Sequence, residues 1–137
     1  MKQVFINLTV NDVEKSLQFY LELGFTLNSL FTDDDQKCVM WSDAIYVMLQ
    51  SKKMASAYLK KPFAVSTQFQ TVSHTLPVEN IQSVNEIIEK GLQAGGTEPV
   101  AALNEGFMFL RSMEDLDGYV WGIMHLNIDT FKSLKEK

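Results

Sequence analysis

Apolar residues recur at every second position in two stretches of the chain, which predicts two strands that each turn one face to a core. The alternating positions are Val4, Ile6, Leu8 and Val10 in the first stretch and Val72, Leu76 and Val78, with His74 between them, in the second. Leu8 corresponds to Leu76 and Val10 to Val78, a spacing of 68 residues. We therefore expect one structural unit to occur twice.

A helix is predicted after each strand, because the apolar spacing changes there from two residues to three or four. Asn11 is the expected N-cap of the first helix, with Glu14 in the capping-box position, and Gly24 ends that helix. Asn80 is the expected N-cap of the second helix, which Gly95-Gly96 ends.

Three strand-like segments follow each helix, at residues 25–32, 37–41 and 44–50, and again at 97–101, 106–112 and 119–126. This order predicts an α+β fold in which two βαβββ modules, residues 1–50 and 71–137, form a barrel-like cleft within a single domain, 1–137. Residues 51–70 are predicted to be a linker that either covers the cleft as a lid or is an exposed connection, with a short helix near Met54.

The stretch EDLDGYVWGIM, residues 114–124, combines a turn and a strand. Asp117-Gly118 between two apolar runs predicts a hairpin with a primed turn, because both residue types accept a positive φ. Gly122 then stands in the middle of the following strand. Glycine at such a position is typical of a bulge or of a place where something needs room.

Composition narrows the class of partner. The 137 residues are 46% hydrophobic and 21% charged, with a net charge of −5 and no basic cluster larger than a lysine pair. A nucleic-acid footprint is missing, and no apolar run has the length of a membrane span. The single cysteine, Cys38, cannot form an internal disulfide, so we expect a cytoplasmic protein that binds neither nucleic acid nor membrane.

The doubled plan carries a family resemblance that spans nearly the whole chain. Its motifs are the opening Phe5–Val10, the helix end Leu23-Gly24-Phe25, Ala94-Gly95-Gly96, and the ending Gly106–Trp121. Together they resemble the vicinal oxygen chelate superfamily, the group of glyoxalase I, bleomycin-resistance proteins and extradiol dioxygenases, and most closely its small glyoxalase-like members. The resemblance is specific for the fold and weak for the reaction. It also implies a homodimer.

The resemblance implies a divalent metal held by histidine or glutamate from the first, fourth, fifth and eighth strands. In this chain those positions are Asn7, Gln50 or a neighbour, Thr75 and Gly122. Two amides, a hydroxyl and a glycine supply no charge to offset a dication, and transition metals prefer imidazole, thiolate or carboxylate ligands. We therefore predict no bound metal and no other cofactor, and we interpret Gly122 as leaving space for a ligand.

Residues of the same strand faces are the candidate pocket, in which no general acid, base or nucleophile stands out. Arg111, the only arginine, either anchors an anion in that pocket or pairs with Glu114 or Asp115 at the hairpin. By strand parity His74 and His125 lie on the opposite, core-facing side. The predicted ligand-binding residues are Asn7, Thr9, Tyr46, Met48, Gln50, Thr75, Arg111 and Gly122.

Such a neutral, partly apolar pocket suits a small organic molecule held by hydrogen bonds. The leading hypothesis is a glyoxalase-like binding protein that has lost the metal site and that sequesters or carries the molecule, which favours a binding protein over an enzyme. One alternative is a metal-dependent lyase, isomerase or dioxygenase of the same superfamily. The other alternative is an interaction module whose pocket is vestigial.

Overall fold

The computed structural model describes residues 1–61 and 72–136, which form two compact units. The N-terminal unit contains residues 1–61 together with Leu116–Gly118, and the C-terminal unit contains the rest of the described chain. Of the predicted linker, residues 62–70 lie outside the described residues. Its first part forms the predicted short helix, α2 (Lys52–Ser56), which Ser51 caps by accepting a hydrogen bond from Met54 N.

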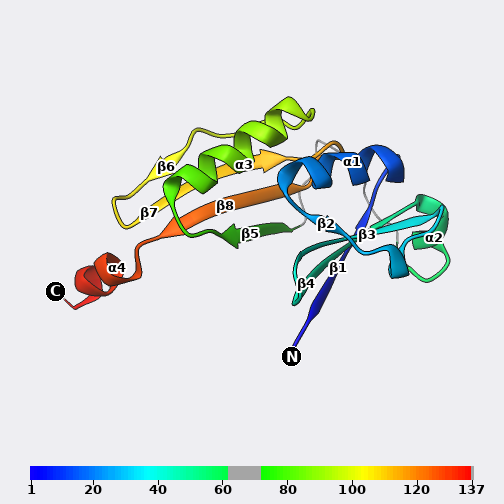
Figure 1. The fold of residues 1–137 in the computed structure, drawn as a ribbon, viewed down its shortest axis with the longest axis horizontal. Coiled ribbons are helices and arrows are strands. Elements are labelled where there is room, and N and C mark those ends of the chain that lie inside the picture. The colour runs from blue at the N-terminus through cyan, green and yellow to red at the C-terminus, as the bar shows by residue number, and fades with distance from the viewer. Residues whose placement is uncertain (62–71, 137) are drawn as a thin grey trace. The chain divides into compact units, whose positions relative to one another are not determined.

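The N-terminal unit is a four-stranded sheet with one main helix (Figure 1). Its sheet, here called sheet A, has the order β1-β4-β3-β2, with β1 parallel to β4 and the other pairs antiparallel. The elements before α2 are β1 (Val4–Thr9), α1 (Val13–Leu23), β2 (Thr26–Leu27), the 3-10 helix η1 (Ser29–Phe31), β3 (Gln36–Ser42) and β4 (Ile45–Gln50).

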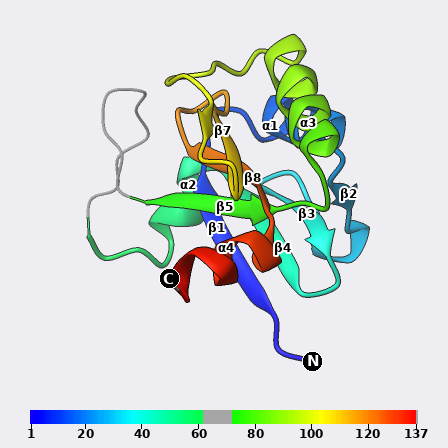
Figure 2. The same cartoon turned by 90° about the vertical axis from the view of Figure 1, so that its left-hand side faces the viewer.

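The C-terminal unit repeats this plan. Sheet B has the order β5-β8-β7-β6, again with a parallel first pair, and α3 runs along one of its faces (Figures 1 and 2). The elements are β5 (Ser73–Pro77), α3 (Ile81–Gln93), β6 (Leu103–Asn104), β7 (Met108–Glu114), β8 (Val120–Leu126) and α4 (Ile128–Lys135). The α+β class and the doubled βαβββ plan are confirmed, while neither sheet closes into a barrel within the described residues.

The register of the two sheets shows which residues correspond. Asn7 pairs with Met48 in sheet A, and Thr75 pairs with Gly122 in sheet B. Because Asn7 and Thr75 are separated by the repeat spacing of 68 residues, Gly122 corresponds to Met48. Gln50 therefore corresponds to Met124 rather than to Gly122, two positions along the same strand face.

Side-chain caps fix where the helices begin. Asn80 caps α3 as predicted, and its Oδ1 accepts a hydrogen bond from Ser83 N at 2.7 Å. The cap of α1 is Asp12 rather than the predicted Asn11, since Asp12 Oδ1 accepts from Lys15 N at 3.1 Å. Asn11 N instead donates to Asp117 Oδ1 at 2.9 Å, so the backbone at Asn11 is held by a carboxylate that is distant in the sequence.

The predicted hairpin between β7 and β8 is confirmed, but its turn differs. Five residues, Asp115–Tyr119, connect the strands, and Asp115 N donates to Tyr119 O at 2.9 Å. Gly118 has a φ of +89°, whereas Asp117 does not have a positive φ, which rules out the primed turn. The Asp117 carboxylate accepts hydrogen bonds from Asn11 N and from Ser16 Oγ, at 2.9 and 3.2 Å.

Two predicted strands are mostly absent. Within residues 25–32 only Thr26 and Leu27 pair with β3, after which the chain turns into η1. Within residues 97–101 only Thr97 bridges to β7, because Pro99 has no backbone N–H to continue a ladder. The sequence reading also missed α4, which Asn127 caps by accepting from Thr130 N.

Each unit has its own apolar core between helix and sheet. The most deeply buried apolar side chains of the N-terminal unit are Val10, Phe19, Tyr20, Val39, Val47 and Leu49, and those of the C-terminal unit are Val84, Ile88, Met113, Trp121 and Ile123. No helix of the described chain is long and apolar enough to cross a membrane.

Candidate functional site

The two faces of sheet A have different neighbours. Lys37 of β3 lies opposite Leu49 of β4, and its Nζ lies 2.9 Å from Glu14 Oε1 on α1. The face that carries Lys37 and Leu49 is therefore the face that packs on α1. Side chains alternate between faces along a strand, so the neighbours of these residues point away from α1.

The side chains that point away from α1 form three rows, which we call the open face of sheet A. The register gives the rows Phe5–Tyr46–Met40, Asn7–Met48–Cys38 and Thr9–Gln50–Gln36. Five of the predicted pocket residues are thus brought together on one face, namely Asn7, Thr9, Tyr46, Met48 and Gln50.

One end of the open face is aromatic. The rings of Phe5 and Tyr46 stack with centroids 4.4 Å apart and an interplanar angle of 14°. Phe31 of η1 meets Phe5 edge-on at 6.1 Å. Phe5 is 44% exposed, so this end offers an accessible aromatic surface on which a flat ligand could stack.

The other end of the open face is a chain of neutral hydrogen bonds. The Tyr58 hydroxyl, just beyond α2, donates to Gln50 Oε1, and Gln50 Nε2 donates to Gln36 Oε1 at 2.9 Å. Gln50 is only 5% exposed. A buried amide needs such partners, because an unsatisfied polar group away from water costs about 1–3 kcal/mol.

Thr75 and Gly122 lie side by side on the face of sheet B that corresponds to the open face of sheet A. A Cβ built on Gly122 would lie 3.0 Å from Thr75 Oγ1 and 3.1 Å from Leu110 Cδ1. The room left by this glycine is therefore taken by two side chains of its own unit. This packing accounts for Gly122 without any ligand.

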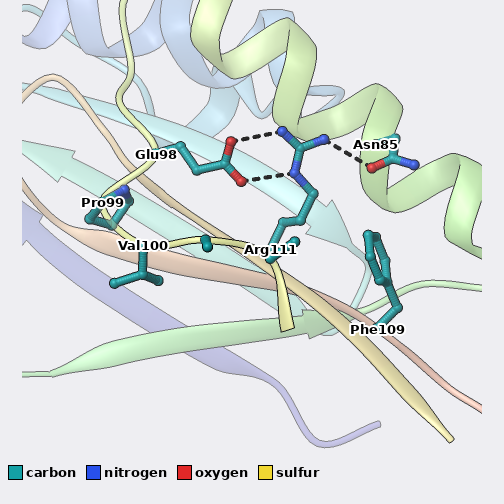
Figure 3. Close-up of a pocket in the computed structure, with 8 residues that line it drawn as sticks. Asn85, Glu98, Pro99, Val100, Phe109 and Arg111 are labelled. Atoms are coloured by element: carbon teal, nitrogen blue, oxygen red, sulfur yellow. Dashed lines mark hydrogen bonds and ion pairs between the residues drawn. The ribbon is translucent and has the colours of Figure 1, made fainter. Parts of the chain in front are cut away.

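Arg111 lies on the opposite face of sheet B from Thr75 and Gly122, because it pairs with Ile123, the next residue of β8. Its partners are not the predicted Glu114 or Asp115. Its Nε and Nη2 donate to the two carboxylate oxygens of Glu98, both at 2.8 Å, and Nη1 donates to Asn85 Oδ1 at 2.9 Å (Figure 3). Arg111 therefore does not join the predicted pocket.

The electrostatics of this cluster follow from the paired charges. Glu89 Oε1 of α3 lies 3.1 Å from Arg111 Nη2, so that the guanidinium faces two carboxylates. Hydrogen bonding to Arg111 lowers the pKa of Glu98 from its usual range, and hydrogen bonding to Glu98 raises the pKa of Arg111. Both groups are charged at neutral pH.

The residues at the superfamily's metal positions do not fit a transition metal. Both functional atoms of the Gln50 amide already hold partners, and Gly122 has no side chain. Asn7 and Thr75 add only neutral oxygens, which do not offset a dication. Among the described residues no group of three or more histidine, cysteine, aspartate or glutamate side chains is placed to hold a metal ion.

The histidines and the cysteine have structural surroundings. His74 packs on Trp121 with ring centroids 5.0 Å apart, and its buried Nδ1 has no hydrogen-bond partner within residues 1–61 and 72–136. His125 Nδ1 lies 3.2 Å from Val78 O. Burial raises the pKa of Cys38, which disfavours the reactive thiolate.

The predicted pocket lacked Gln36, Cys38 and Met40 of the open face, and also Phe31 and Tyr58, which contact that face. Gln36 has the same strand parity as Cys38, so extending the predicted strand by one residue would have found it. Phe31 and Tyr58 arrive from η1 and from the residues after α2, and no periodicity placed these side chains beside β1 and β4. Thr9, Cys38, Met48 and Gln50 are buried, so the part of the open face that a flat, partly polar molecule could contact is the surface around the exposed Phe5 and Asn7.

Comparisons with known proteins agree with this architecture. Residues 2–42 match the model of a family described as bleomycin resistance protein-like N-terminal. No curated protein matches the chain. A solved structure of a hypothetical protein from S. aureus is similar, with 24% identity, coverage of 91% of this chain and 94% of that chain, and a TM-score of 0.77.

Two further similar structures carry family names. A glyoxalase-related enzyme from Fulvimarina pelagi has 19% identity, covers 91% of this chain and 88% of its own, and gives a TM-score of 0.76. A glyoxalase/bleomycin resistance protein/dioxygenase family enzyme from Burkholderia phytofirmans PsJN has 13% identity, with 92% and 99% coverage and a TM-score of 0.74. The resemblance to the vicinal oxygen chelate superfamily is confirmed at the level of the fold.

Proposed function

We propose that this chain, which has the glyoxalase/bleomycin-resistance/dioxygenase fold, binds a small organic molecule on the open face of sheet A and uses no metal. One observation carries this proposal, namely that the face joins a stacked aromatic pair at one end to a buried glutamine at the other. Fold alone does not specify activity, so the argument rests on these side chains.

The chemistry of the face defines the class of ligand. Phe5 and Tyr46 offer a flat apolar surface, and stacking of aromatic rings contributes about 0.5–1.5 kcal/mol beyond area burial. Asn7 is exposed between the two ends and has both a donor and an acceptor. These groups suit an uncharged, partly aromatic molecule that carries an amide, carbonyl or hydroxyl group.

The open face contains no pair of groups suited to acid–base chemistry. Its side chains are aromatic rings, thioethers, amides, hydroxyls and the buried thiol of Cys38. General acid–base catalysis needs a group whose pKa lies near the working pH. Sequestration or transport of the ligand is therefore the activity that we propose, in preference to turnover.

The proposed protein works in the cytoplasm as a homodimer. Cys38 is a free, buried thiol, as is usual in a reducing compartment. β1 is an edge strand of sheet A whose Val4 and Phe5 are exposed, and exposed edges favour pairing with another chain. Sedimentation analysis across a range of protein concentrations tests the dimer, and a mass of 15.6 kDa throughout would contradict it.

A ligand screen by thermal shift tests binding. Compounds with an aromatic ring and one amide or carbonyl group should raise Tm, and Gln50→Leu and Phe5→Leu should each reduce the shift. Gln93→Leu makes the same chemical change on exposed α3 of the other unit and should leave the shift intact. Equal shifts in all three variants would place binding elsewhere.

Elemental analysis after incubation with zinc, nickel, iron and manganese tests the metal. The proposal expects no stoichiometric metal, because the side chains at the family positions are neutral or absent. One tightly held metal ion per chain would overturn it and favour a metal-dependent enzyme of the superfamily.

A further inference from the structure

The β6–β7 edge of sheet B is interrupted by an outward bend of the chain. Thr97 bridges to Glu114, and the next pair is Leu103 with Leu110. Five residues, 98–102, therefore lie opposite only three of β7, 111–113. The longer segment has to bow away from the sheet, and a pocket of about 480 Å³ opens beneath it.

The walls of this pocket are apolar and its floor is polar. Phe109 of β7 and the bowed segment Pro99–Ala102 form the walls, where Val100 is 60% exposed. Arg111, Glu98 and Asn85 form the floor, and Figure 3 shows the guanidinium held between Glu98 and Asn85. A volume of this size lies in the range of small-molecule sites.

The charges of the floor, together with that of Glu89, decide which ligand fits. Glu89 does not line the pocket, but it binds the guanidinium that does. The Arg111 fork already donates to both oxygens of Glu98 and to Glu89, so an anion would have to displace a bidentate pair. Two carboxylates against one guanidinium leave a net charge of −1 at this point. Glu89 is 57% exposed and uses only Oε1 toward Arg111. A positively charged ligand meets an attractive field here, and an anion a repulsive one.

We propose that this pocket is a second binding site, for a small organic monocation with an apolar body. The ammonium group lies against Glu98 in the field to which the charge of Glu89 adds, and the body packs on Phe109 and on the bowed segment. A cation near an aromatic ring gains additional attraction from the ring's negative face. The site is separate from the open face of sheet A, because every residue that lines it belongs to the C-terminal unit.

Three ligands of one shape but different charge test this site: phenethylammonium, phenethyl alcohol and hydrocinnamate. Titration of the ¹⁵N-labelled protein, followed by amide chemical shifts, reports both location and affinity. Phenethylammonium should move the amides of Val100, Ala101, Ala102 and Phe109 and should bind more tightly than the alcohol, while hydrocinnamate should bind most weakly. Equal or tighter binding of hydrocinnamate, or shifts that leave those four amides unmoved, would overturn the proposal.

Paired substitutions on α3 separate local from general electrostatics. Glu89→Gln should weaken phenethylammonium binding about three- to fivefold, the size expected for one partly exposed charge pair. Glu86→Gln removes the same charge from an exposed position nearby on α3 and should change the affinity by less than about 1.5-fold. Phe109→Leu should weaken binding about two- to fivefold. If both glutamate variants behave alike, the ligand senses only the net charge of the chain and the site is refuted.

Discussion

The two units share one register, yet corresponding positions have diverged in what they do. Lys37 of β3 lies opposite Leu49, and Arg111 of β7 lies opposite Ile123, so the two cations correspond. Each reaches a carboxylate on the helix of its own unit, Glu14 on α1 and Glu89 on α3. A cation from the same strand position thus links sheet to helix in both units.

The other faces of the two sheets differ more. In sheet A the middle row places Met48 beside Asn7, and in sheet B the corresponding row places Gly122 beside Thr75. The corresponding face of sheet B also carries polar side chains, namely Ser73, Thr75, Ser112 and Glu114, but it has no glutamine pair like Gln50 and Gln36, while Arg111 lies on the other face, under α3. The two units therefore share one strand order and register, while the side chains at corresponding positions differ.

The largest expected effect on stability comes from replacing a residue of one unit by the residue at the corresponding position of the other. Gly122→Met places a side chain where Thr75 and Leu110 already lie, and should lower the free energy of unfolding by about 2–3 kcal/mol through overpacking. Met48→Leu, a volume-conserving change at the corresponding position, should cost less than about 1.5 kcal/mol. Urea denaturation measures both, and equal costs would contradict the packing account of Gly122.

The two cations should respond differently to the same substitution. Arg111→Met leaves Glu98 and Glu89 facing each other without their guanidinium, and should cost about 2 kcal/mol at neutral pH. Lys37→Met leaves Glu14, which is 67% exposed, and the backbone oxygen of the exposed Asp33, and both regain water, so the cost should stay below about 1 kcal/mol. Denaturation of both variants at pH 7 gives the comparison, and a larger loss in Lys37→Met would reverse our view of which cation is needed.

The pH dependence of stability gives a second test of Arg111. Arg111 lowers the pKa of Glu98 in the folded chain, so the stability from this pair is present above the unfolded pKa and is lost as the pH falls through the folded value. The cost of Arg111→Met should therefore shrink as the solution is acidified. A cost that is constant with pH would mean that the substitution acts through packing alone.

The hydrogen-bonded chain on sheet A has no counterpart at the corresponding residues of sheet B, where Met124 replaces Gln50. Tyr58→Phe removes the donor to Gln50 Oε1 and should destabilise the N-terminal unit by about 1 kcal/mol. Thermal denaturation measures the loss. Gln50→Met, which introduces the residue found at the corresponding position of sheet B, removes the hydrogen bonds of Gln50 to both Tyr58 and Gln36. Tyr58→Phe should therefore cost nothing in that background.

The smallest effect is a pH dependence confined to the C-terminal unit, which contains both histidines, His74 and His125. Burial lowers the pKa of His74 below the ordinary 6.5, so the unfolded chain takes up the proton first as the pH falls. Stability should therefore decline below pH 6.5 and stay level above it. His74→Phe should flatten the profile between pH 5 and 7 relative to His125→Gln. Parallel profiles would contradict this role of His74.

The repeated elements were predictable because their signals are local. Alternation gave β1 and β5, Gly24 gave the end of α1, Asn80 gave the start of α3, and the repeat spacing made Thr75 the counterpart of Asn7. The prediction of a strand at residues 97–101 was wrong because it relied on the apolar content of the segment and gave too little weight to Pro99, which interrupts a strand. The missed α4 had a signal of its own, Asn127 before Asp129 with Lys132 and Lys135 in the last turn.

The candidate sites were less predictable because their contacts join distant residues. Strand parity placed Asn7, Thr9 and Gln50 on one face correctly. Arg111 was predicted to join them in one pocket with Gly122, but it lies on the opposite face of its sheet from Gly122. No pattern identified its partners Glu98 and Glu89, which lie 13 and 22 residues from Arg111 in the sequence. Side-chain partners at such separations depend on how the helix lies on the sheet, which no local pattern encodes.

The tip of the β7–β8 hairpin, Leu116–Gly118, makes the folding of the N-terminal unit depend on a late part of the chain. Asp117, counted within that unit, accepts hydrogen bonds from Asn11 N and Ser16 Oγ across 106 and 101 residues of sequence. During synthesis on the ribosome, these hydrogen bonds at the start of α1 therefore cannot form until most of the chain has emerged. Contacts of such long separation slow folding. A chain truncated before residue 117 should leave the N-terminal unit incompletely folded. A separate peptide that contains the hairpin tip should restore its folding.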